Sequence, residues 1–71
     1  MSYEVRAEMS ASVWKVVAAA GDKVTDADTL VILESMKMEI PVYPESDGTV
    51  RELLVQEGDV VTEGDVIAVV D

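Results

Sequence analysis

The chain has 71 residues, which is enough for one small domain and too few for two domains of ordinary size. Its 15 acidic and 5 basic residues give a net charge of −10, which argues against nucleic acids and anionic membrane surfaces as partners. It has no cysteine and no histidine, so disulfides and metal sites built on thiolates or imidazoles are excluded.

The composition favours an all-β fold. Hydrophobic residues make up 49% of the chain and aromatic residues only 4%, with valine prominent among the rest. This hydrophobic fraction is too high for a disordered chain, and β-branched residues favour strands. No apolar run approaches the roughly 20 residues that cross a bilayer. The first residues also lack a basic region followed by an apolar stretch, so we expect no secretory signal and a cytoplasmic protein.

Two copies of one unit appear when the chain is shifted by 37 positions against itself. Residues 12–34 then match residues 49–71 without a gap, and six of these positions are identical. The match extends backward more weakly, through Val5 with Val42 and Glu8 with Glu45. We therefore expect two similar halves.

The residue pattern of each copy predicts four short strands, separated by turns that contain Gly-Asp or acidic residues. Eight strands at this spacing are typical of a sandwich or a flattened barrel. In chain order the expected strands are Tyr3–Ala7, Val13–Ala18, a short Val-Thr piece at 24–25, Thr29–Glu34, Met38–Tyr43, Val50–Val55, a second Val-Thr piece at 61–62, and Val66–Asp71.

The second turn differs between the copies, because Ala27 corresponds to Gly64. If this position needs a positive φ, alanine costs about 1 kcal/mol relative to glycine. Two outcomes are open: the first half is the weaker one, or its turn has a different shape.

Residues 34–39, Glu-Ser-Met-Lys-Met-Glu, link the two copies and are predicted to form a hairpin. A helix is disfavoured because Ile40 precedes Pro41, and a helix of this length would be marginal. The flanking segments both read as strands. The hairpin tip is therefore expected near Met36 and Lys37.

Lys37 is the candidate functional residue of this hairpin. Most lysines are simply solvated, and the flanking methionines could be ordinary gap-filling residues. However, Ser35, Met36 and Met38 are not the Gly, Asn or Asp residues that hairpin turns prefer. Lys37 also stands alone at the junction of the repeat, which favours a special role.

The segment Glu34–Glu39 resembles the biotinyl-lysine signature of biotin carboxyl carrier domains, in which Met-Lys-Met presents the modified lysine. The resemblance covers residues 1–71, which we interpret as a single biotinyl domain similar to standalone biotin/lipoyl attachment proteins. Two departures concern turn shape: Ser10-Ala11 stands where the family commonly has Pro-Gly, and Ala27 where it has Gly. The chain also has no room for the "thumb" insertion of some bacterial carriers. Further similar segments are Glu8–Val13, Gly21–Val24, Ile40–Val42, Asp47–Val50 and Glu57–Val61.

This resemblance implies both a fold and a role. The fold would be a flattened barrel-sandwich of two four-stranded antiparallel sheets with quasi-twofold symmetry, monomeric, with the hairpin at one end and both termini at the other. Biotin protein ligase would join biotin to Lys37 through an amide. Lysine amines are mostly protonated at neutral pH and no base stands beside this one, so activation is expected from the ligase. The chain would be a carrier and not an enzyme, moving carboxylate between biotin carboxylase and carboxyltransferase.

The residues around Lys37 allow two interpretations each. Met36 and Met38 either pack against the hairpin or form an apolar collar that the ligase or the carboxylase recognises. Glu34 and Glu39 are either a solvated rim or contacts for basic residues of the ligase. Ser35 is a further candidate for recognition by the ligase.

Two alternative functions stay open. One is a lipoyl-type carrier for acyl transfer, although lipoyl hairpins typically have an acidic residue before the lysine and a small one after it, which Met36 and Met38 do not match. The other is an unmodified acidic interaction module.

Overall fold

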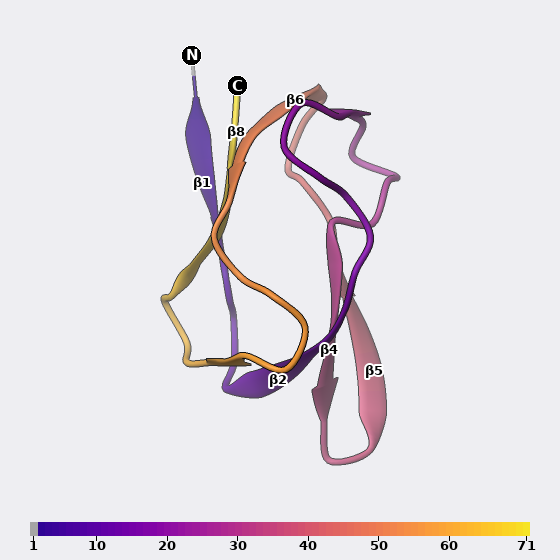
Figure 1. The fold of residues 1–71 in the computed structure, drawn as a ribbon, viewed down its shortest axis with the longest axis vertical. Coiled ribbons are helices and arrows are strands. Elements are labelled where there is room, and N and C mark those ends of the chain that lie inside the picture. The colour runs from indigo at the N-terminus through magenta and orange to yellow at the C-terminus, as the bar shows by residue number, and fades with distance from the viewer. Residues whose placement is uncertain (1) are drawn as a thin grey trace.

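A computed structural model describes residues 2–71, which form eight β-strands in two four-stranded antiparallel sheets (Figure 1). The described residues contain no helix that could cross a membrane. The sheet orders are β1-β8-β6-β3 and β5-β4-β2-β7. The predicted fold class is therefore confirmed. The strands are β1 (Tyr3–Arg6), β2 (Ala11–Val16), β3 (Lys23–Val24), β4 (Val31–Ser35), β5 (Met38–Val42), β6 (Gly48–Leu53), β7 (Val60–Val61) and β8 (Val66–Val70).

The predicted internal symmetry is present in the backbone. Shifting residue numbers by 37 places β2 on β6 and β3 on β7, and it exchanges the two sheets. Equivalent hydrogen bonds join the halves. The Gly21 N–H donates to the Val50 carbonyl at 2.7 Å, and the Gly58 N–H donates to the Val13 carbonyl at 2.9 Å. Both glycines have a φ near +95°, of 95° and 93°, which suits glycine because it lacks a Cβ atom.

The core is narrow and filled by aliphatic side chains. On β4, Val31 and Leu33 point inward and are buried, whereas Glu34 points outward and is exposed. This alternation is the period of two that a strand imposes. Within residues 2–71 no polar or charged side chain is buried. The largest fully buried side chains come from both copies: Val13, Leu30, Val31, Leu33, Val50, Ile67 and Val70.

The predicted limits of β2 and β6 were wrong in the same way, and β4 begins at Val31 and not at the predicted Thr29. The apolar runs Val13–Ala18 and Val50–Val55 were predicted as strands, but β2 and β6 begin and end two residues earlier. In β2 the regular ladder ends because the N–H groups of Val17 and Ala18 both donate to the Leu30 carbonyl, at 3.0 Å each. Ala18 is still buried, so the apolar pattern continues beyond the ladder.

The turn at Ala27 has a different shape from its counterpart. Gly64 has a φ of 94°, whereas Ala27 is not among the residues with positive φ. The Gly64 turn is tied to the chain before β2, because Ala7 donates to the Asp65 carbonyl at 2.8 Å. The repeat equivalent of Ala7 is Pro44, which has no N–H to donate. Of the two outcomes left open by the sequence, the different shape is therefore correct.

Candidate functional site

A two-residue turn joins β4 to β5 and contains the candidate lysine. Ser35 pairs with Met38, which leaves Met36 and Lys37 as the central residues of the turn. Their φ angles are 53° and 66°, the positive values at both central positions that define a type I′ turn. The predicted position of the hairpin tip is confirmed. A left-handed conformation costs roughly 1–2 kcal/mol for each residue other than glycine, so this tip is strained.

The side chains of the tip project into solvent. Met36 is 91% exposed and Met38 is 64% exposed, so neither is held mainly by packing against the hairpin. Lys37 is also exposed. Among the hydrogen bonds and ion pairs of residues 2–71, none involves the Lys37 amine. The arrangement is a free amine between two exposed thioether side chains.

Two carboxylates lie directly below the tip, on the outer face of the sheet. Glu34 pairs with Glu39 across β4 and β5, and both are exposed. Like charges directly opposite each other destabilise a sheet slightly. The ion pairs within the described residues are Arg6–Glu4 and Arg51–Asp71, so these two carboxylates have no cationic partner among residues 2–71. They are available to a basic surface of another protein.

The base of the hairpin is rigid, because its inner face is part of the core. Leu33, which is 2% exposed, pairs with Ile40, and Val31 below it is fully buried. The tip extends beyond this packed region at one end of the barrel, and both termini lie at the other end (Figure 1). The strand pairing therefore holds the turn in place while the lysine side chain is free to move.

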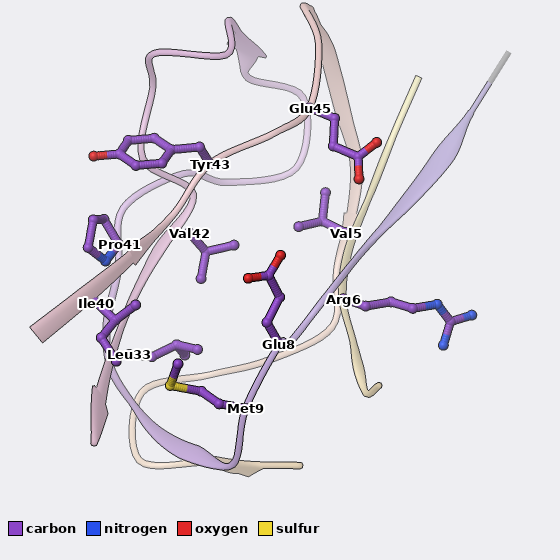
Figure 2. Close-up of a pocket in the computed structure, with 10 residues that line it drawn as sticks. All are labelled: Val5, Arg6, Glu8, Met9, Leu33, Ile40, Pro41, Val42, Tyr43 and Glu45. Carbon is purple, nitrogen blue, oxygen red and sulfur yellow. The ribbon is translucent and has the colours of Figure 1, made fainter. Parts of the chain in front are cut away.

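A groove of about 240 Å³ opens beside the hairpin, between edge strand β1 of one sheet and edge strand β5 of the other. Figure 2 shows Met9, Leu33 and Ile40 at one end of it, Glu45 at the other, and the Glu8 carboxylate between them. The residue patterns of the sequence do not predict this groove. The one related signal in the sequence is the weak repeat match of Val5 with Val42 and of Glu8 with Glu45. All four residues line the groove, so it lies near the quasi-twofold axis that relates the two copies.

Arg6 also borders the groove, but its guanidinium group points away from it (Figure 2). It donates to the Gly64 carbonyl at 2.7 Å and forms an ion pair with Glu4. The carboxylates of Glu8 and Glu45 are thus not neutralised by the one arginine that is close to them.

Residues 4–70 match the family model Biotin_lipoyl, described as "Biotin-requiring enzyme". The chain belongs to this biotin/lipoyl family. It is 51% identical over 70 residues to the biotinylated protein TB7.3 homolog of Mycobacterium leprae, covering 99% of each chain. It is 46% identical over 63 residues to the biotin/lipoyl attachment protein of Bacillus subtilis, covering 89% of this chain and 86% of that protein.

A solved structure shows the same fold. The urea carboxylase of Kluyveromyces lactis matches with a TM-score of 0.93 and 37% identity, over 100% of this chain and only 6% of that enzyme. The predicted membership of the biotin/lipoyl family and the predicted fold are confirmed, and the predicted carrier role and biotin cofactor agree with this family. The hairpin fits the cofactor, because covalent attachment through an amide needs an accessible amine and the Lys37 side chain is exposed.

Proposed function

We propose that biotin protein ligase attaches biotin to Lys37, and that the biotinylated domain is a carrier without catalytic activity of its own. The observation that supports this site is the exposed Lys37 on a left-handed turn between two exposed methionines. The other two lysines lie on strands. The Lys15 amine is 5.4 Å from the centre of the Trp14 ring, and Lys23 pairs with Thr49 in a sheet.

The residues of the hairpin have separate tasks in this proposal. The paired strands hold the turn, the turn points the lysine stem into solvent, and the stem provides the first part of a flexible arm. Met36 and Met38 form the apolar collar that the ligase and the carboxylase contact, and Glu34 and Glu39 meet basic residues of the ligase. When bound, biotin supplies the ureido ring that carries carboxylate from a biotin carboxylase to a carboxyltransferase.

The charge of the domain supports its encounter with such partners. A net charge of −10 on a chain of this length repels other copies of the domain. The same charge attracts proteins with basic surfaces and raises the rate at which they meet the domain. Tethering the cofactor to the domain also raises its local concentration at each partner site.

The test is enzymatic modification followed by intact mass measurement. Purified protein is incubated with biotin protein ligase, biotin and ATP, and one biotin is expected on each chain. Lys37→Arg is expected to abolish incorporation while the circular dichroism spectrum stays unchanged, because the substituted side chain is exposed. Lys15→Arg and Lys23→Arg are matched controls that should be modified fully. Capture of the Lys37→Arg protein by streptavidin would show that the site is elsewhere.

Lipoate is a second candidate, because a relative with 46% identity is named a biotin/lipoyl attachment protein. The mass of the protein isolated from a host with both ligases separates the possibilities, since biotin and lipoate add different masses. We expect the biotin adduct. A chain without any adduct would support the unmodified interaction module instead.

A further inference from the structure

The groove between β1 and β5 begins at the level of the lysine hairpin. Ser12 on β2 pairs with Glu34 on β4, so the segment that precedes β2 lies beside the end of the hairpin. This segment contains Glu8 and Met9, two residues that line the groove. Ile40, another lining residue, is three positions after Lys37, which corresponds to roughly 10 Å along a strand.

A biotin group on Lys37 would reach this groove. Its ring is separated from the lysine Cα atom by about eleven bonds, which span roughly 14 Å when extended. This length exceeds the separation along the strand and leaves slack for the arm to fold back.

The groove also has a suitable size and chemistry. A cavity of about 150 Å³ accommodates benzene, with about six heavy atoms, whereas the bicyclic head of biotin has about nine. The groove, at about 240 Å³, exceeds the benzene-sized cavity by nearly the same ratio as the biotin head exceeds benzene in heavy atoms. Met9, Leu33 and Ile40 provide apolar surface for the sulfur-containing ring. Glu8 provides a carboxylate, and ureido N–H groups donate strong hydrogen bonds to carboxylates.

We propose that this groove is a resting site for the biotin head on the domain's own arm, with the ring against Met9, Leu33 and Ile40 and a ureido N–H donating to Glu8. This inference rests on the proposed function, because it requires biotin on Lys37. A carboxylate carried by the ring would repel the Glu8 carboxylate, so the groove binds the unloaded arm and releases the loaded one.

The site does not need high intrinsic affinity. A ligand on a short flexible tether has an effective concentration in the millimolar range. A dissociation constant of about 1 mM is therefore enough to keep the groove occupied for about half of the time. Such binding is weak enough for a partner enzyme to draw the biotin out.

The experiment compares nuclear magnetic resonance spectra of the full chain before and after biotinylation by the ligase, with intact mass used to confirm one biotin in every sample. We expect shift changes at Met9, Leu33 and Ile40 in addition to residues 35–38, and nuclear Overhauser contacts between biotin ring protons and the Met9 and Ile40 side chains. Glu8→Gln should lose at least half of the shift change at Met9 and Ile40 without any loss of biotinylation.

The matched control is Glu45→Gln, which removes the repeat-equivalent carboxylate at the far end of the groove. It should keep the full shift changes. Changes confined to residues 35–38, or identical changes in the Glu8→Gln protein, would overturn the resting site and leave the proposed function intact. A mass without biotin would overturn the proposed function and this inference together.

Discussion

The Lys37 hairpin and the end of the barrel that holds the termini occupy equivalent places in the repeat, yet they are built differently. The 37-residue shift places Ile40 of β5 on Tyr3 of β1, and β4 corresponds to β8. At the hairpin end, a two-residue turn with positive φ angles connects β4 to β5. At the other end β8 and β1 pair, with Tyr3 opposite Val70, although no turn connects them (Figure 1).

This difference shows that pairing of the two strands does not by itself require a connecting turn. Strand pairing and the core hold β1 against β8 without a turn, so the same forces are sufficient to hold β4 against β5. The strained conformation of Met36 and Lys37 is therefore not explained by the stability of the barrel. Under the proposed function, this conformation serves to present the lysine.

The largest effect on stability is expected from substitutions in the core, and it tests whether both halves contribute equally. Leu30 and Ile67 are repeat equivalents, and both are fully buried. Leu30→Ala and Ile67→Ala should each lower the free energy of unfolding by about 2–5 kcal/mol. That is a large part of the roughly 4–10 kcal/mol expected for a domain of this length. Urea denaturation measures both variants, and a variant with nearly unchanged stability would show that its half is dispensable.

A second prediction concerns the strain at the tip. Replacing Met36 by Asn and Lys37 by Gly installs the pair that type I′ turns prefer. The free energy of unfolding should rise by roughly 1–2 kcal/mol, and biotinylation should be lost with the lysine. Thermal denaturation measures the gain.

Lys37→Ala is the matched control for this variant, because it removes the lysine without relieving the left-handed backbone. It should show no comparable gain in stability. An equal gain in the control would mean that the lysine side chain, and not the turn conformation, is the source of strain.

The smallest effects are expected at the second turns of the two halves. Gly64→Ala should cost about 1 kcal/mol through backbone strain alone, since a Cβ atom there would meet nothing within 4 Å at a φ of 94°. Ala27→Gly should cost about 0.5 kcal/mol by making the unfolded chain more flexible. Chemical denaturation measures the free energy of unfolding of both variants. A stabilising Ala27→Gly would contradict the different shape assigned to that turn.

The sequence predicted the position of the hairpin tip well because its signals are local. Pro41 disfavours helical geometry at Ile40, and the flanking apolar runs read as strands. The tip at Met36 and Lys37 follows from these two signals. The limits of β2 and β6 could not be predicted in the same way. Their apolar patterns continue past the paired residues. In β2 the pairing ends where Val17 and Ala18 share the carbonyl of Leu30, the residue before β4.

By itself, the sequence determined the two-copy β architecture, the hairpin between the copies, the lysine at its tip and the resemblance to biotin carrier domains. Strand periodicity, turn residues and the short motif are readable within a few neighbouring positions, and the repeat is readable as a fixed spacing of 37 residues. Only the tertiary structure decided that Met36 and Lys37 are left-handed, that Glu34 faces Glu39, and that a groove lies between β1 and β5. The turn conformation and the Glu34–Glu39 pair depend on the register of β4 against β5, which residue preferences alone do not specify. The groove depends on the approach of two sheets, which brings together residues far apart in the chain.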